Sequence, residues 1–205
     1  MTANYPIMLR LEGKIVVVVG GGKVAERKVA GLLGKGARVH VISPEVTEEL
    51  RRLVSEGMIV WLQKSFSEND MKEAFMIFAA TNDEELNRLV KNSASEHQLV
   101  TVADDPEGSD FHVPSHLQRG RLSIAISTGG ASPTLAGKIR KQLEEQFDDS
   151  YEAYLEFLFK TRQWILKEVG DSSLKRKLLT AIVTPRFLSN ENRDEEFRRL
   201  YEELM

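Results

Sequence analysis

The stretch Lys14–Lys28, with the sequence KIVVVVGGGKVAERK, decides the fold that we expect for this chain. A run of β-branched residues, Ile15–Val19, leads into three glycines and then into a segment compatible with a helix. Such a run is typical of a buried parallel strand, and glycines directly after it indicate a tight turn. In the spacing Gly20-x-Gly22-x-x-Ala25, the first glycine permits the turn, the second lets the backbone approach a pyrophosphate, and the alanine lets the helix pack closely.

A glycine-rich turn alone is weak support for a cofactor, because such turns also connect strands to helices without binding a ligand. Here a second strand is expected at Arg38–Ile42, so that the turn belongs to a βαβ unit. The amides at the start of the helix and its dipole favour a phosphate. We therefore expect a dinucleotide to contact Gly20, Gly22, Lys23, Val24 and Ala25. Lys23 is equally compatible with a merely solvated charge.

Strands and helices alternate as far as about residue 103. Strands are expected at 14–19, 37–42, 58–62, 75–80 and 99–103, and helices at 23–34, 45–56, 67–73 and 83–95. This alternation predicts an α/β fold with a Rossmann-type parallel sheet and helices on both faces. Ligands bind such sheets at the carboxyl ends of the strands. Four loops should therefore surround one crevice: Gly20–Gly22, Ser43-Pro44, Ala80–Asn82 and Ala103–Asp105.

The residues after the second strand, Ser43, Pro44 and Glu45, occupy the place where a dinucleotide-binding domain commonly carries a carboxylate for the ribose. Ser43 can hydrogen-bond to a ribose hydroxyl, and Glu45 could reach it after a rearrangement. No Arg or Lys follows the strand to hold a 2′-phosphate, so we expect NAD rather than NADP. Thr81 and Asn82, after the fourth strand, complete the expected cofactor site.

Two carboxylates, Asp104 and Asp105, follow the fifth strand and precede Pro106. Catalytic groups on this fold lie at such strand ends, and paired carboxylates can act as a general base or hold a metal. The alternative is an Asx-type turn before the proline. His112 and His116 are separated by a proline and do not share a helix face, so no permanent metal site is expected.

The pattern changes after Pro106. Two strands are expected at Phe111–Pro114 and Arg121–Ser127, joined through Gln118–Gly120, and a helix is expected from Thr134 to about Gln146. Ser132 is suited to cap this helix, with Pro133 in its first turn.

Thr128, Gly129 and Gly130, just before that helix, form a second candidate anion-binding loop. A bend that only reverses the chain is the alternative. Basic residues lie nearby in sequence and suit an acidic substrate, although they are also compatible with a solvated face; they are Arg119, Arg121, Lys138 and Arg140.

From Asp149 onward the sequence is expected to be helical, with apolar stripes that indicate core packing. The stripes are Tyr151, Tyr154, Leu155, Leu158 and Ile165; Leu174, Leu178, Leu179 and Ile182; and Phe197, Leu200, Tyr201 and Leu204. Ser172 or Ser173 is expected to cap the second of these helices and Pro185 to end it, and the third starts near Asn190.

Composition limits the possible functions. The chain has 205 residues, of which 41% are hydrophobic, and a formal net charge of -3, which gives no support for nucleic-acid binding. It has no cysteine, which excludes disulfides, thiolate metal sites and iron–sulfur clusters held by this chain. Residues 1–13 lack a signal-peptide apolar core and no run is long enough to cross a membrane, so a cytoplasmic location without membrane partners is expected.

In combination, these motifs resemble the precorrin-2 dehydrogenase / sirohydrochlorin ferrochelatase family of sirohaem synthesis. The likeness is strongest over residues 7–148, and GGGxVAxRK together with STGGxSP is much more specific than the dinucleotide pattern alone. The matching segments, in family order, are VVGGGKVAERK (Val18–Lys28), ISPE (Ile42–Glu45), AATND (Ala79–Asp83), ADDP (Ala103–Pro106), FHVPS (Phe111–Ser115) and STGGASP (Ser127–Pro133).

The resemblance implies NAD-dependent oxidation of precorrin-2 to sirohydrochlorin, and in some members the insertion of iron into the product. It implies a homodimer with an NAD-binding domain over residues 1–113, a small α+β dimerisation region over 114–148 and an all-helical C-terminal domain over 149–205 that helps to enclose the active site. The family's key aspartate corresponds to Asp104. The tetrapyrrole substrate is a polycarboxylate, which suits binding by Thr128, Gly129, Gly130 and Arg119.

Two other functions compete with this interpretation. An NAD-sensing regulatory module would need the glycine turn but not STGGASP beside an acidic strand-end loop. A dehydrogenase of another small acid would be expected to carry a His or Lys at the acid–base position, and neither is found there. Turnover with precorrin-2 and NAD distinguishes all three.

Overall fold

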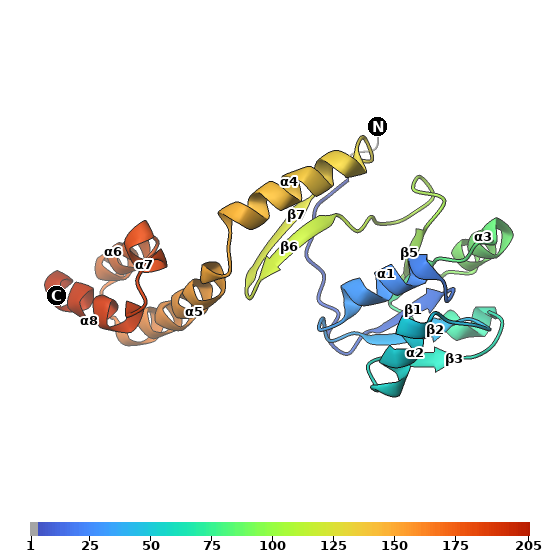
Figure 1. Ribbon diagram of the computed structural model, residues 1–205. Coiled ribbons are helices and arrows are strands. Elements are labelled where there is room, and N and C mark those ends of the chain that lie inside the picture. The colour runs from blue at the N-terminus through green and yellow to red at the C-terminus, as the bar shows by residue number, and fades with distance from the viewer. Residues whose placement is uncertain (1–3) are drawn as a thin grey trace. The chain divides into compact units, whose positions relative to one another are not determined.

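A computed structural model describes residues 4–205 (Figure 1). The chain divides into two compact units, and each is described by itself. The sheet unit comprises Tyr5–Val113, and the helical unit comprises Pro114–Met205 together with Asn4. The three-part division expected from the sequence stays a prediction, and the start of its first domain, residues 1–3, lies outside the described range.

The sheet unit contains a five-stranded parallel sheet in the order β3-β2-β1-β4-β5. Its strands are β1 (Ile15–Val19), β2 (Arg38–Ile42), β3 (Val60–Leu62), β4 (Met76–Ala79) and β5 (Leu99–Val102). Its helices are α1 (Lys23–Leu32), α2 (Glu48–Ser55), the 3₁₀ turn η1 (Glu68–Met71) and α3 (Glu84–Asn92). All five strands begin and end close to the residues predicted from the sequence.

Both faces of this sheet are covered, because successive side chains along each strand point to opposite faces. On one face α1 and α2 pack on β1, β2 and β4, with Val18, Val29 and Leu50 fully buried. On the other face η1 and α3 cover the sheet, and Ile77 and Val90 are fully buried. The prediction of a parallel sheet between two layers of helices is therefore confirmed.

The helical unit begins with an antiparallel hairpin of β6 (Ser115–Arg119) and β7 (Leu122–Ile126). In Figure 1, helix α4 (Pro133–Gln146) runs along this hairpin, and it contacts β6 more than β7. Leu117 pairs with Ile124 on the covered face and is buried.

The expected strand at Phe111–Pro114 is wrong, and so is the expected connection at Gln118–Gly120. The first strand starts after Pro114, whose ring nitrogen has no hydrogen to donate to a ladder. The hairpin is closed by a two-residue turn, Gly120-Arg121, in which Gly120 has φ +51°. Two-residue hairpins favour this left-handed conformation, because its twist matches that of the strands.

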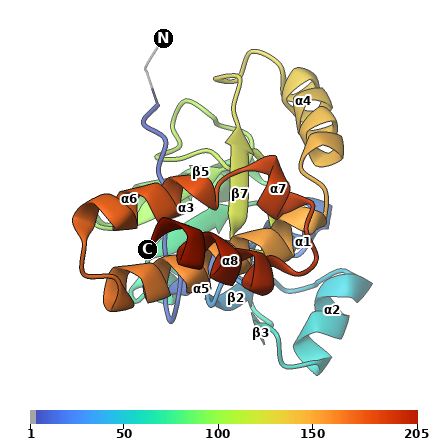
Figure 2. The same ribbon diagram turned by 90° about the vertical axis from the view of Figure 1, so that its left-hand side faces the viewer.

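Helices α5 (Ser150–Glu168), α6 (Ser172–Ala181), α7 (Pro185–Leu188) and α8 (Arg193–Leu204) complete the helical unit, and Figure 2 shows α6 lying alongside α5. The predicted stripes supply much of their common core. Two large side chains outside the stripes, Phe157 and Phe187, stack in it with ring centroids 5.6 Å apart. The buried residues are Tyr154, Phe157, Ile165, Val169, Leu178, Ile182, Phe187 and Phe197.

The predicted cap of α6 is wrong. Asp171 is the N-cap, and its carboxylate accepts the Leu174 N–H at 2.6 Å, so Ser172 is already helical. Pro185 lies past the end of α6 and starts the short helix α7, which suits its fixed φ. Within residues 4–205, no helix is long and apolar enough to cross a membrane.

Candidate active site

The glycine turn after β1 fits closely between the loops that follow β2 and β4. Gly20 has φ +116°, and a Cβ atom at this position would lie 2.3 Å from the carbonyl oxygen of Ala80. A Cβ atom on Gly21 would lie 1.9 Å from the carbonyl oxygen of Glu45 and 2.8 Å from Ser43 Oγ. The dinucleotide pattern allows any residue at position 21, so the sequence analysis missed the need for a glycine there. That need comes from the loop after β2, which lies against Gly21.

Gly22 differs from its two neighbours, because a Cβ atom there would meet nothing within 4 Å. It is the N-cap of α1, and the first backbone bond of the helix runs from the Glu26 N–H to the Gly22 carbonyl at 2.9 Å. The amides of Lys23, Val24 and Ala25 precede that bond, and such groups have no acceptor inside the helix. Open space beside free amides fits a diphosphate.

Two of these N-terminal side chains have local roles in the structure. Ala25 is fully buried against the sheet, as its small size allows. Lys23 is 79% exposed and pairs with Glu26 at 3.0 Å. Hydrogen bonds from Thr47 and from Lys23 hold the pKa of Glu26 below its usual value. The charge of Lys23 is therefore partly compensated within α1.

The loop after β2 is held by hydrogen bonds from β3 and the residue that follows it. The indole N–H of Trp61 donates to the Ser43 carbonyl at 2.9 Å, and the amide of Gln63 donates to the Pro44 carbonyl at 3.4 Å. Glu45 is exposed, and its carboxylate makes no hydrogen bond to another described residue. The backbone of this loop is thus fixed while the carboxylate is accessible.

The loops after β4 and β5 are joined by Asn87 of α3, a residue that the sequence analysis did not single out. Its Nδ2 donates to Asp104 Oδ1 at 3.0 Å and to the Thr81 carbonyl at 3.2 Å. Its Oδ1 accepts the Thr81 N–H at 3.1 Å. Asn82, beside Thr81, is exposed. The hydrophobic pattern of α3 places position 87 on its buried face, and a polar residue there is the signal that was available.

The two adjacent aspartates have different surroundings. Asp105 accepts the Gly108 N–H at 2.9 Å, and its own carbonyl accepts the Ser109 hydroxyl at 2.8 Å, which is a local turn. Asp104 is exposed and bonds to Asn87 instead. The Asx-type turn that was the alternative for this pair is therefore made by Asp105, and Asp104 is available at the edge of the sheet.

The second candidate loop, Thr128–Gly130, uses most of its hydrogen-bonding groups internally. Thr128 Oγ1 accepts the Ser132 N–H at 3.1 Å, and the Thr128 carbonyl accepts the Ala131 N–H at 3.0 Å. The Gly129 N–H is bonded to Ser127 Oγ at 3.2 Å. Both glycines have positive φ, +59° and +84°. The two glycines are exposed, Thr128 is half-buried, and hydrogen bonds within the segment Ser127–Ser132 hold the loop.

The basic residues near this loop are mostly paired with carboxylates. Arg119 Nη1 donates to the Gln118 carbonyl, and Arg119 Nε lies 3.0 Å from Asp149 Oδ1 without hydrogen-bond geometry. Arg121 pairs with Glu156 at 2.8 Å. Arg140 pairs with Glu144 on α4. Lys138 is exposed and makes no ion pair with the described residues.

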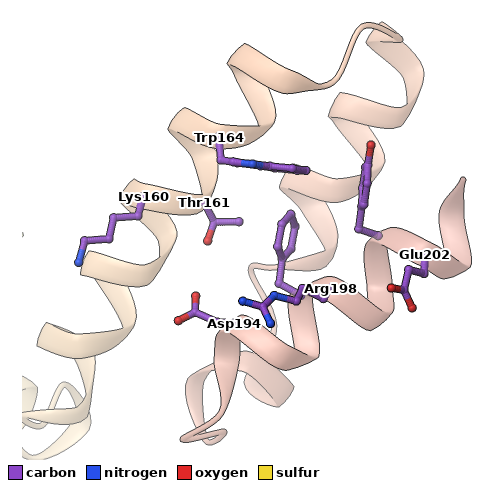
Figure 3. Close-up of a pocket in the computed structure, with 8 residues that line it drawn as sticks. Lys160, Thr161, Trp164, Asp194, Arg198 and Glu202 are labelled. Atoms are coloured by element: carbon purple, nitrogen blue, oxygen red, sulfur yellow. The ribbon is translucent and has the colours of Figure 1, made fainter.

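A cavity of about 440 Å³ lies between α5 and α8 in the helical unit (Figure 3). Trp164 forms one wall, with its ring packed edge-on against Phe197 and Tyr201. Asp194 and Arg198 project from α8 toward the same space. None of the sequence-predicted site residues lines it. Among the described residues, no group of three or more His, Asp or Glu side chains could hold a metal ion.

The parallel sheet and the glycine turn define the sheet unit as a nucleotide-binding domain of the dehydrogenase type. Comparison with protein-family models supports this class, because residues 7–115 match a putative NAD(P)-binding family. Residues 119–146 match the central domain of sirohaem biosynthesis proteins, and residues 151–197 match the SirC C-terminal domain.

The chain belongs to the precorrin-2 dehydrogenase and sirohaem synthase family. It is 37% identical to a precorrin-2 dehydrogenase of Priestia megaterium over 94% of this chain and 96% of that protein. It is also 37% identical to a sirohaem synthase of Nitrosococcus oceani, of which it spans only 42%. The solved structure of SirC, a precorrin-2 dehydrogenase, covers 98% of the chain with a TM-score of 0.83 and 36% identity. The family resemblance read from the sequence is confirmed.

Proposed function

We propose that this protein oxidises precorrin-2 to sirohydrochlorin with NAD, and that Asp104 receives the proton that the substrate loses. The observation that carries the proposal is the continuous set of contacts at one edge of the sheet. Gly20 packs on Ala80, and Asn87 bonds to both Thr81 and Asp104. These contacts support a single site that combines a dinucleotide turn with an accessible carboxylate.

The oxidation removes a hydride and a proton from the tetrapyrrole. NAD, when bound, supplies the hydride acceptor. The free amides at the start of α1 and the open space at Gly22 suit its diphosphate, while Ser43 and Glu45 suit its ribose. Asp104 then has the role of a general base, which an exposed carboxylate at a strand end can perform.

We also propose that Thr128, Gly129, Gly130 and Arg119 contact the carboxylates of the tetrapyrrole. Gly129 and Gly130 are exposed, and Ser132 caps the start of α4 by accepting the Leu135 N–H at 3.1 Å. A helix N-terminus favours negative charge. The exposed Lys138 on the same helix adds to this preference.

The proposal includes a homodimer and a cytoplasmic location, where NAD is supplied. The dimer is supported by the surface of α4, on which Ala136 is the one buried residue of 14. A two-stranded sheet such as β6–β7 is also marginally stable alone and has free edges. We propose that residues 114–148 form the dimerisation region, between an NAD-binding domain over 1–113 and a helical domain over 149–205.

Replacement of Asp104 tests the assignment. With precorrin-2 and NAD, Asp104→Ala should lower kcat about a hundredfold, because general-base catalysis contributes about that much. NADH and sirohydrochlorin are followed together. Glu107→Ala, an exposed carboxylate of the same loop, is the matched control and should keep the parent rate. Equal rates for Asp104→Ala and the parent enzyme would remove the role of Asp104, and an absence of turnover in the parent enzyme would remove the proposed function.

A further inference from the structure

Asn87 is a buried polar residue at the centre of the candidate site. Its side chain is 1% exposed, and it lies in α3 just after the loop that follows β4. Burying an amide costs free energy unless its donors and acceptor find partners. The partners of Asn87 lie in two loops, one containing Thr81 and the other Asp104. These two residues are more than 20 positions apart in the sequence.

The contacts of Asn87 fix which way its amide points. The oxygen accepts the backbone N–H of Thr81, which can only donate, and the nitrogen donates to the Thr81 carbonyl, which can only accept. Rotating the amide by half a turn would break both bonds. The NH₂ group must therefore face Asp104 Oδ1, 3.0 Å away.

Asp104 depends on this contact for its orientation. It is exposed, and within residues 4–205 the bond from Asn87 is the one hydrogen bond of its side chain. An exposed aspartate without a partner would sample several rotamers. The contact with Asn87 holds one carboxylate oxygen and leaves Oδ2 free to accept a proton.

We propose that Asn87 is the positioning residue of Asp104: its buried amide orients the carboxylate and ties it to the cofactor loop at Thr81. This inference rests on the proposed function, in which Asp104 receives the proton. Because the same amide bonds to both loops, it keeps the general base in register with the residues expected to hold the cofactor. Such placement contributes to rate, since small displacements of a catalytic group are costly.

Asn87→Asp is the decisive substitution. It keeps the shape and the oxygen that accepts the Thr81 N–H, but it replaces the NH₂ group, which donates to Asp104 and to the Thr81 carbonyl, by a second oxygen. We expect kcat to fall about tenfold or more, which corresponds to about 1.4 kcal/mol or more in the barrier. The dissociation constant for NAD, measured by calorimetry, should change less than kcat, because the Thr81 N–H and hydroxyl still donate to the retained oxygen although the bond to the Thr81 carbonyl is lost. Asn92→Asp makes the same charge change on the exposed end of α3 and should behave like the parent enzyme.

The pH–rate profile gives a second readout. A new carboxylate at position 87 disfavours ionisation of Asp104, so the acidic limb of the profile should move to higher pH. The other carboxylates at this edge are engaged or point outward: Asp83 caps α3 through the Leu86 N–H, Asp105 bonds to Gly108, and Glu84 and Glu85 are exposed in the first turn of α3. The inference is supported if the acidic limb of the pH–rate profile moves to higher pH in Asn87→Asp but not in Asn92→Asp.

A double-mutant cycle with Asp104→Asn separates positioning from a purely structural role. If Asn87 acts through Asp104, adding Asn87→Asp to Asp104→Asn should not lower kcat further. Equal reductions in both backgrounds, or a parent-like kcat and pH profile for Asn87→Asp, would overturn the inference. Asp104→Asn with the parent rate would instead remove the proposed role of Asp104. If Asn87→Asp does not fold, Asn87→Ser takes its place in the cycle, because it removes the amide without adding charge. Its effect on kcat is then compared in the parent and Asp104→Asn backgrounds.

Discussion

Gly20, Gly21 and Gly22 are adjacent in the sequence but lack a side chain for different reasons. Gly20 needs a left-handed φ and close contact with Ala80, and Gly21 lies against the backbone of Glu45. Gly22 has an ordinary φ of -85° and open space beside it. Two of these glycines are therefore required by the fold, whereas the third is free for a ligand to approach.

This difference predicts opposite results for two alanine substitutions. Gly20→Ala should destabilise the protein by about 2 kcal/mol or more, since it combines a disfavoured φ with a backbone clash. Gly22→Ala should change stability by less than about 1 kcal/mol but weaken NAD binding about tenfold, because the methyl group fills the approach of the diphosphate. Urea unfolding and NAD calorimetry on both variants check this. Parent-like NAD affinity in Gly22→Ala would contradict the assignment of the turn.

At the residue scale, local sequence patterns identify the glycine turn and the strand-end loops as candidates, because spacing and strand ends are local properties. Their binding and catalytic roles stay predictions. The requirement at Gly21 and the partners of Asn87 come from contacts between segments far apart in the chain, although a polar residue on the buried face of α3 marks position 87 locally. The neighbour of Arg119 was also not predicted: Asp149 lies 3.0 Å from its Nε, and the role of Arg119 in substrate binding stays a prediction.

Among the elements, the short 3₁₀ turn η1 is stabilised by a few polar contacts. Ser67 and Asp70 form a capping box, and Lys64 pairs with Asp70 at 2.6 Å. Burial raises the pKa of Asp70, but the hydrogen bonds from Lys64 and Ser67 outweigh it and hold the pKa below the usual 3.8. The ionised carboxylate of Asp70 therefore stabilises the folded state at pH values above 3.8, the usual pKa. This stabilisation is lost as the pH falls through the lower pKa that Asp70 has in the folded state.

Asp70→Ala should consequently destabilise the protein by about 1 kcal/mol at neutral pH, the usual cost of losing a cap. The difference from the parent protein should shrink as the pH falls below 3.8, because the parent then loses the same interaction. Urea unfolding across this pH range measures it, with Glu68→Ala, an exposed carboxylate of the same turn, as the control. A constant difference at all pH values would show that ionisation of Asp70 is not involved.

The sequence predicts the sheet unit better than the hairpin. Five β-branched or apolar strands and amphipathic helices are strong periodic signals and match the structure closely, except that the helix expected at 67–73 is the shorter 3₁₀ turn η1. The first hairpin strand was misplaced because FHVP is apolar but ends in a proline, while the true strand, Ser115–Arg119, is mostly polar. Its one buried residue, Leu117, is recognisable only from the partner strand and α4.

For the whole molecule, the two units have separate hydrophobic cores and match different family models. Helix α4 buries only Ala136 within the described residues, and Leu135 on it is 50% exposed. We expect a second copy of the chain to cover this helix.

The protein should accordingly sediment with the mass of two chains. Leu135→Glu should weaken the dimer about tenfold or more, because it places a charge where apolar contact is expected. Analytical ultracentrifugation over a range of concentrations measures the change, and Glu145→Gln at the other end of α4 is the control. A parent protein that remains monomeric at high concentration contradicts the dimer.

The two tryptophans of the chain lie in different units. Trp61 is hydrogen-bonded to the Ser43 carbonyl beside the expected ribose site, whereas Trp164 packs against Phe197 and Tyr201 and is 41% exposed. Each half of the polypeptide thus contains its own intrinsic fluorophore. In a variant that keeps only the indole at 61, emission reports on the nucleotide loop, and in one that keeps only the indole at 164 it reports on the helices, so that melting of either half can be followed without an added label.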